Sequence, residues 1–167
     1  MKMQKFFKGL MLLAVASLAA CGGGGDSSGA TGQPYSITLR SDKNQLPLNV
    51  SGQRPSIGAS ATYTTTLYVD ARRGEEPIPG GEDIVACNLV QGLGSGALYY
   101  LDGDAEHEDE NKIPLPYRSV TLDVNSGVAS FHFHALDTPG TARITCTVTD
   151  PRDQQIRSAS VDIVVSN

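Results

Sequence analysis

The segment LDGDAEHEDENK, residues 101 to 112, is the densest cluster of acidic side chains in the sequence. Carboxylate oxygens are the ligands that calcium prefers, and Asp102, Asp104 and Glu106 alternate at a spacing that a loop can fold around one ion. A helix-loop-helix calcium site requires glycine at its sixth position and glutamate at its twelfth, and no register of this segment supplies both. We therefore expect a solvated loop that joins two strands, and we keep calcium or a basic partner as an alternative use of residues 102 to 110.

A second candidate is the tetrapeptide FHFH. Side chains alternate between the two faces of a strand, so His132 and His134 would share one face, and Phe131 and Phe133 the other. Two imidazoles arranged in this way form half of a zinc or copper site, which His107 would have to complete. The interpretation that we favour is a core face of two phenylalanines opposite a solvated face of two histidines. The sequence then requires no metal.

Catalytic motifs are missing from the sequence. It contains neither the G-x-S-x-G turn of hydrolases, nor the H-E-x-x-H pair of zinc proteases, nor a phosphate-binding glycine loop. Serine and aspartate are common, but nothing in their spacing selects a catalytic triad. We predict that the protein is not an enzyme and that it uses no cofactor.

Cys87 and Cys146 each lie in a stretch of alternating apolar residues. Cys87 shares its predicted face with Val85 and Leu89, so both thiols should point into the core. A disulfide between them would close a loop of about 60 residues and stabilise the fold by about 4 kcal/mol in the loop-entropy model. The alternative is two buried free thiols. We favour the disulfide because the sequence also indicates export to an oxidising compartment.

That indication comes from the N-terminus. Residues 1 to 20 have a basic start, an apolar run too short to span a bilayer and small residues at the end, as in a secretory signal. The stretch LAAC resembles the lipobox of bacterial lipoproteins, which implies cleavage before Cys21 and a lipid, including palmitate-type chains, on its thiol. The alternative is an ordinary signal cut near Ala20. Residues 21 to 34, the lipidated cysteine and its Gly/Ser-rich continuation, should form a flexible linker.

Charge and the lipid anchor together predict where the protein acts. The formal charge of −5 becomes more negative once the three lysines of the signal are removed, which argues against a nucleic-acid partner. We expect attachment to the membrane through the lipid alone. Glycine follows the lipidated cysteine where a retention signal would have aspartate, so we expect the cell envelope and its outer membrane as the location.

The rest of the chain, residues 35 to 167, alternates with a period of two and predicts strands rather than helices. The DIVACNLV segment is apolar on both faces, as expected of a strand covered on both sides. DVNSGVAS has the glycine and asparagine of a hairpin turn. Eight such runs separated by turn residues predict an all-β domain, a sandwich of about seven to nine strands. The runs begin YSIT, ATYT, DIVA, GALY, RSVT, VASF, TARI and SASV.

Three turn motifs resemble the invasin/intimin type of bacterial immunoglobulin-like domain. They are DARRGEEPIPGG, with Asp70, Gly74 and the PIPG turn; DVNSGVA, with Asn125 and Gly127; and PGTA, which begins at Pro139. The resemblance implies an immunoglobulin-like β-sandwich, with Cys87 and Cys146 similar to the inter-sheet disulfide of immunoglobulin domains. It further implies a spacer, an adhesive module or a protein-interaction module, while the runner-up is a periplasmic binding module that uses the acidic loop.

Overall fold

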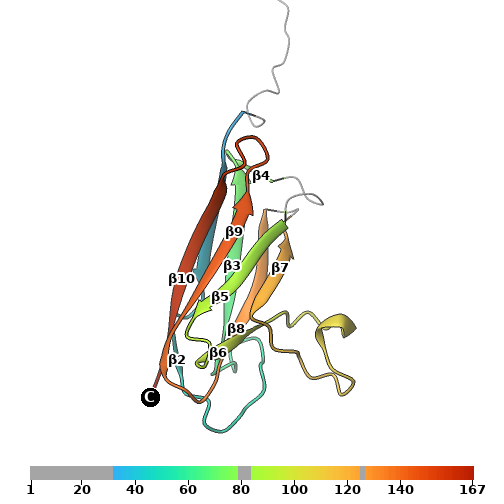
Figure 1. The fold of residues 1–167 in the computed structure, drawn as a ribbon. Helices are drawn as coiled ribbons and strands as arrows, with labels where there is room; N and C mark the ends of the chain where they lie inside the picture. Colours follow the sequence, from blue (N-terminus) through green and yellow to red (C-terminus); the bar gives the residue numbers. More distant parts are fainter. Residues whose placement is uncertain (1–31, 79–83, 125–126) are drawn as a thin grey trace, which may run out of the picture.

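The computed structural model describes residues 32–78, 84–124 and 127–167 (Figure 1). The predicted signal peptide, Cys21 and most of the predicted linker lie outside these residues. Ten strands and one 3-10 helix form within them: β1 (Tyr35–Ser41), β2 (Gln45–Pro47), β3 (Thr64–Arg73), β4 (Glu76–Pro77), β5 (Ile84–Gln91), β6 (Gly96–Tyr99), η1 (Ala105–His107), β7 (Ser119–Asp123), β8 (Val128–Ala135), β9 (Gly140–Thr149) and β10 (Ile156–Ser166).

The strands form two five-stranded sheets that pack face to face. One sheet has the order β1-β3-β8-β6, with β4 added beside β3, and the other has the order β2-β10-β9-β5-β7. β2 runs parallel to β10, whereas all other named pairs are antiparallel. The all-β sandwich predicted from the sequence is therefore confirmed.

All eight predicted runs contain a strand, but the prediction for DIVACNLV is wrong in one respect. The face of β5 that carries Val85, Cys87 and Leu89 is buried, while Val90 on the other face is 55% exposed. β5 has a neighbouring strand on each side, β9 and β7, but only one face of its sheet meets the other sheet. An apolar outer face is thus tolerated here without a covering layer.

The predicted hairpin at DVNSGVAS is also wrong. β7 pairs with β5 and β8 pairs with β3 and β6, so the chain crosses from one sheet to the other between them. Gly127 has φ of 86°, and its carbonyl accepts a hydrogen bond from Ala71 N at 3.0 Å. The glycine supplies the left-handed backbone that the motif predicted, but in a crossover.

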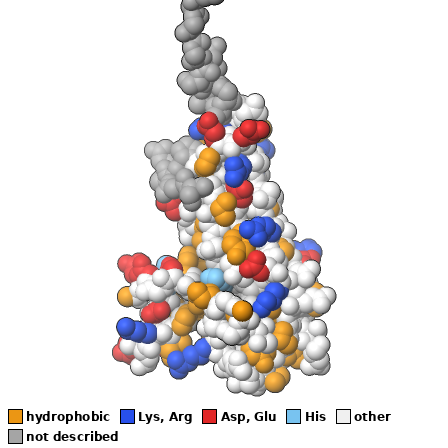
Figure 2. All heavy atoms as spheres, turned by 180° about the vertical axis from the view of Figure 1, so that it is seen from behind, with side chains coloured by type: hydrophobic (Ala, Val, Ile, Leu, Met, Phe, Trp, Pro, Cys, Tyr) orange, Lys and Arg blue, Asp and Glu red, His pale blue; other side chains and the backbone are white. Residues whose placement is uncertain are grey.

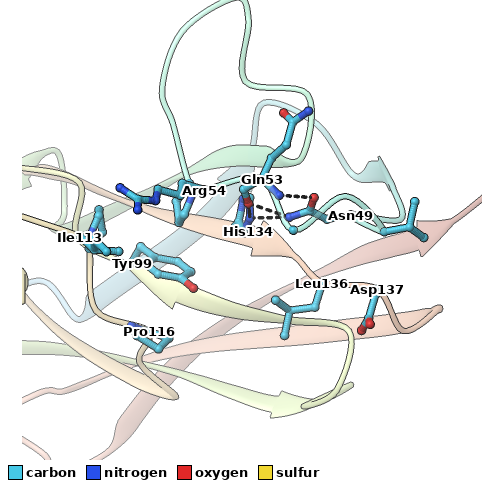
Figure 3. A pocket seen from close by; sticks show the side chains of 13 residues that line it. Asn49, Gln53, Arg54, Tyr99, Ile113, Pro116, His134, Leu136 and Asp137 are labelled. Carbon is cyan, nitrogen blue, oxygen red and sulfur yellow. Dashed lines mark hydrogen bonds between the residues drawn. The ribbon is translucent and has the colours of Figure 1, made fainter. Parts of the chain in front are cut away.

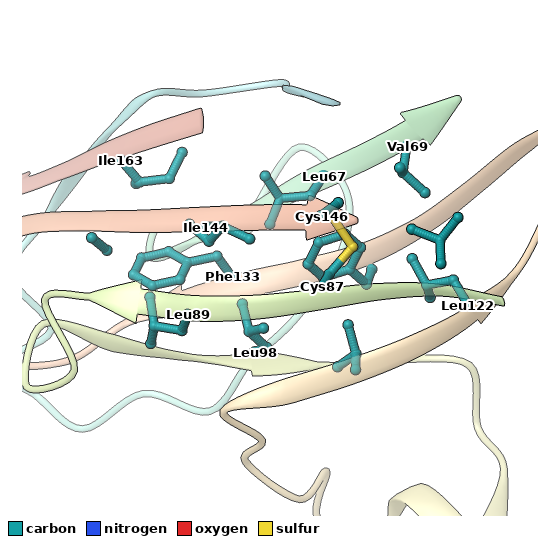
Figure 4. Packing of buried hydrophobic residues seen from close by; sticks show 14 of the residues in the cluster. Leu67, Val69, Cys87, Leu89, Leu98, Leu122, Phe133, Ile144, Cys146 and Ile163 are labelled. Carbon is teal, nitrogen blue, oxygen red and sulfur yellow. A yellow bond between two sulfur atoms is a disulfide. The ribbon is translucent and has the colours of Figure 1, made fainter. Parts of the chain in front are cut away.

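The core lies between the sheets and includes Phe131 and Phe133, both fully buried, as the sequence predicted (Figure 4). Gly96 at the start of β6 is required here, because a Cβ atom would come within 2.1 Å of the Phe133 ring. Close packing of a large ring against bare backbone leaves no room for another residue at that position.

Cys87 and Cys146 form a disulfide in this core, and both residues are fully buried. The prediction of the bond is confirmed, but its likeness to the inter-sheet disulfide of immunoglobulin domains is not. The two cysteines face each other on β5 and β9, which are neighbours in one sheet, with 4.0 Å between their Cα atoms. The bond therefore fixes the register of two strands instead of joining the two sheets.

Candidate functional site

The acidic segment forms a long connection between β6 and β7 that contains η1 (Figure 1). Its carboxylates bond to its own backbone. Asp102 accepts from the Asp104 amide and Asp104 from the Glu106 amide, each at 3.0 Å, and Asp109 accepts from the Asn111 and Ile113 amides, each at 2.8 Å. These are Asx turns, in which aspartate stabilises a local turn.

An aromatic cluster attaches this segment to the edge of the neighbouring sheet. The ring of His107 stacks on Tyr100 with 3.8 Å between centroids, and its Nδ1 lies 2.8 Å from Asp102 Oδ2. Although partial burial acts in the opposite direction, the Asp104 amide and His107 lower the pKa of Asp102. The Tyr100 hydroxyl accepts from Thr121 N at 2.7 Å and donates to Thr121 O at 3.1 Å. Tyr100 thereby occupies both backbone groups of one residue on the edge strand β7.

The two histidines of FHFH have different surroundings, so the prediction that both lie on a solvated face is wrong for one of them. His134 is only 2% exposed, whereas His132 is half-buried on the same face of β8. His132 Nδ1 is buried and has no hydrogen-bond partner in the described part of the chain. Burial lowers the pKa of His132, and the carboxylates of Asp102 and Asp42 partly oppose this effect.

The described residues contain no group of three or more His, Cys, Asp or Glu side chains that could hold a metal ion. Asp102 contacts His107, while His134 bonds to residues of another loop. The possible metal ligands Asp102, Asp104, Glu106, His132 and His134 are therefore not brought together as one site.

A pocket of about 490 Å³ opens at one end of the sandwich (Figure 3). It lies between the β2–β3 loop, residues 48 to 63, and the β6–β7 connection, and Tyr99 and His134 contribute to its wall. We call this end, with the β2–β3 loop and residues 136 to 139, the open pole. The lining residues are Asn49, Val50, Gly52, Gln53, Arg54, Pro55, Tyr99, Ile113, Pro114, Pro116, His134, Leu136 and Asp137.

His134 holds the β2–β3 loop against the sheet. Its Nδ1 lies 2.8 Å from Thr64 Oγ1, and its Nε2 lies 3.0 Å from Asn49 Nδ2 and 2.9 Å from Gln53 O. Asn49 Nδ2 also donates to Gln53 O at 2.8 Å, and Asn49 Oδ1 accepts from Gln53 N at 2.8 Å. Burial lowers the pKa of His134, and the bond to Gln53 O partly opposes this, so the network contains a neutral imidazole. In that form the ring has one N–H, which at Nε2 can donate to Gln53 O while Nδ1 accepts from the Thr64 hydroxyl.

The network was not foreseen from the sequence. The stretch LPLNVSGQRP has no periodic pattern, and nothing in it marks Asn49 or Gln53 as partners of a histidine 81 to 85 positions away. Tyr99 was assigned to a predicted strand, GALYYL, but not to a site.

Charged residues occupy the opposite end of the sandwich, where the start of β1 meets the β9–β10 turn, residues 150 to 155. We call it the tether pole. The Asp150 side chain is fully buried and accepts from Tyr35 N at 2.9 Å, Arg152 N at 3.1 Å and Arg152 Nη2 at 3.1 Å. Arg152 also donates to Gly32 O. The Arg152 guanidinium, together with these amides, holds the pKa of Asp150 far below its usual range.

Comparisons with known proteins identify no family for this chain. No protein-family model matches the sequence, and no curated protein matches it either. A conjugate transposon protein from Bacteroides vulgatus, solved by NMR, is similar at 13% identity and a TM-score of 0.40, over 79% of this chain and 86% of that one. BslA, a bacterial hydrophobin, is similar at 10% identity and a TM-score of 0.33, over 80% of this chain and 95% of that one. Both neighbours are β-rich domains, and such low similarity identifies neither a family nor a function.

Among the described residues, no helix has the length and hydrophobicity needed to cross a bilayer.

Proposed function

We propose that this chain is an exported, lipid-anchored, non-catalytic module of the immunoglobulin-like type that binds a partner at its open pole. The observation that carries the proposal is the polarity of the sandwich. The described chain starts at the tether pole, and the β2–β3 loop lies at the opposite end (Figure 1). Residues of that loop line the pocket. If Cys21 carries a lipid, the linker enters the domain on the side nearest the membrane and the pocket faces away from it.

The strand order supports the immunoglobulin-like type. In a constant-type immunoglobulin domain, strands A, B, E and D form one sheet and C, F and G the other. β1, β3, β8 and β6 would take the places of A, B, E and D, and β5, β9 and β10 those of C, F and G. Several features depart from that pattern. The strands β2 and β4 have no place in it, β7 is inserted before the E position, and the disulfide lies between C and F.

The first turn motif of the invasin/intimin resemblance is compatible with this assignment. Gly74, with φ of 64°, lies between β3 and β4, and Asp70 pairs with Arg72 at 2.9 Å. The PIPG turn begins with Pro77 and the fully buried Ile78, and its last two residues lie outside the described residues. In that family the domain serves as a spacer or an adhesive module, and the pocket here favours adhesion to a partner over a purely spacing role.

The surface of the open pole supports a binding role. Figure 2, seen from behind, shows hydrophobic side chains gathered at the end of the molecule away from the grey segment. Val50 is 77% exposed there, and Ile57, Leu93 and Leu115 are also exposed. Exposed apolar groups around a pocket are typical of interaction sites. The alternative use of the acidic loop for calcium has no comparable support, because Asp102, Asp104 and Asp109 already bond to backbone amides.

The test is photo-crosslinking in intact cells of a Gram-negative host. A photoreactive residue replaces Val50 at the open pole in one variant and Ile156 at the tether pole in the other; Ile156 is a matched control because it is also an exposed aliphatic side chain, at 67%. We expect discrete adducts from position 50 only, and a diacylglyceryl group on Cys21 by mass spectrometry. An unmodified Cys21 with residues 1 to 20 still attached, or equal adducts from both positions, would contradict the proposal.

A further inference from the structure

The pocket at the open pole contains a polar group that has no hydrogen-bond partner among the described residues. Tyr99 is only 7% exposed, and its hydroxyl points into the pocket (Figure 3). No group of the described residues accepts or donates a hydrogen bond at this hydroxyl. Burial raises the pKa of Tyr99, with Arg118 acting in the opposite direction, so the hydroxyl keeps its proton. The hydroxyl faces the pocket, where a ligand can replace water as its hydrogen-bond partner.

Two charged side chains of the pocket lining form no ion pair with any described residue. Arg54 forms no hydrogen bond or ion pair with any described residue, and Asp137 accepts only a long bond from Thr138 Oγ1, at 3.4 Å. Several other arginines in the described chain have a partner; Arg143, for example, forms a two-pronged contact with Asp162 at 2.8 Å. Figure 3 shows Arg54 beside Ile113 at one end of the pocket and Asp137 beside Leu136 at the other, with Tyr99 between them.

The wall between these charges is apolar and stiff. Val50, Pro114, Pro116 and Leu136 contribute to it, and proline backbones change little on binding. The pocket volume of about 490 Å³ falls in the range of sites that hold a compact ligand. The wall therefore suits an apolar side chain, and the hydroxyl above it suits a backbone amide group.

We propose that the pocket binds a short, extended peptide segment of a partner protein, with an aliphatic side chain against Tyr99 and Leu136, an acidic group toward Arg54 and a basic group toward Asp137. This inference rests on the proposed function and names the class of its partner. Charge complementarity carries it: a ligand with only an anionic or only a cationic group leaves one end of the pocket unmatched. A purely apolar ligand leaves the Tyr99 hydroxyl and both charges unmatched.

The experiment is an NMR titration of the mature chain, without lipid, with blocked five-residue peptides. One peptide has glutamate first, leucine in the middle and lysine last; a second reverses the charges, and two controls have glutamate or lysine at both ends. We expect one mixed-charge order to bind at least about fivefold more tightly than the other three peptides, with saturable shifts at Tyr99 and His134. Free leucine, which carries both charges on adjacent atoms, should bind more weakly still.

A double charge exchange, Arg54→Asp with Asp137→Arg, should invert the preference between the two mixed-charge orders without changing the folded spectrum. Both side chains are exposed, so the substitution does not disturb the core. Equal binding of all four peptides, no saturable shift up to about 5 mM, or an unchanged preference in the exchanged variant would overturn the inference. Such a result would leave the crosslinking from position 50 intact, whereas failure of that crosslinking would remove the proposed function itself.

Discussion

Each pole of the sandwich is stabilised by its own buried polar network, which is charged at one pole and neutral at the other. At the tether pole a fully buried carboxylate, Asp150, collects two backbone amides and the Arg152 guanidinium. At the open pole a buried neutral imidazole, His134, collects a hydroxyl, an amide and a carbonyl. A charged cluster is strong only while every partner is present, whereas neutral groups can exchange partners or tautomers at small cost. The two poles should therefore respond differently to the loss of a single group.

The largest loss of stability is expected from a substitution of Asp150 at the tether pole. We expect Asp150→Ala to lower Tm by roughly 10 °C, because it removes the buried carboxylate to which the amides of Tyr35 and Arg152 and the Arg152 guanidinium donate. Hydrogen exchange should accelerate along β1 and the β9–β10 turn and stay unchanged in the β2–β3 loop. Differential scanning calorimetry and exchange mass spectrometry measure the two effects.

The matched control for that variant is Asp162→Ala. Asp162 also pairs with an arginine, Arg143, but both partners are exposed, and such pairs contribute little. We expect a Tm change of no more than about 2 °C. If Asp162→Ala lowered Tm as much as Asp150→Ala, or if hydrogen exchange in the Asp150 variant accelerated uniformly over the chain, the tether pole would not be a distinct unit.

A smaller effect is expected from His134→Leu at the open pole. The substitution removes the partner of Thr64 and Asn49 and should destabilise the fold by about 2 kcal/mol, since the buried Asn49 amide keeps only its bonds to Gln53. Exchange should accelerate in residues 49 to 56 and not along β1. His107→Leu is the control, because His107 is only partly buried and its ring stacking can be replaced by an apolar side chain. Equal loss of stability in the two variants would contradict the role given to the network.

Acid should separate the two poles without any substitution. The pKa of His134 is lowered in the folded chain, so its contribution to stability is lost as the pH falls below about 6.5, the value for an unfolded histidine. The pKa of Asp150 is also lowered, but from the carboxyl range, so its contribution persists down to about pH 4 and is lost only below it. Exchange measured at pH 7, 5 and 3 should accelerate first in the β2–β3 loop and later along β1. The reverse order would refute the assignment of neutral and charged chemistry to the two poles.

The sequence predicts which face of a strand is buried better than it predicts which strands lie next to each other. The eight predicted strands and most of their inward residues were predicted correctly because alternation is local, whereas the short strands β2 and β4 were missed. The Cys87–Cys146 bond follows from two inward thiols. The partner of each strand was not predicted: β7 and β8 alternate and flank a turn, as a hairpin would, and only tertiary packing places them in different sheets. His132 and His134 share one pattern and differ only because a loop without periodicity covers one of them. The site depends on that loop, which is why most of it could not be foreseen.

The smallest effect should come from Tyr100→Phe, which tests whether the acidic segment is attached independently of the open pole. Phenylalanine keeps the stacking on His107 but loses both bonds to Thr121 on the edge of β7. Water can reach these groups, so we expect the free energy of unfolding to fall by about 1 kcal/mol or less. Hydrogen exchange should become faster at Thr121 and stay unchanged in residues 49 to 56. Tyr68→Phe is the control, because it loses one exposed bond to Asp42 and should change stability still less. If Tyr100→Phe instead loosened the β2–β3 loop, the pocket and the acidic segment would form one cooperative unit, and the pocket would depend on the edge of β7 as well as on His134.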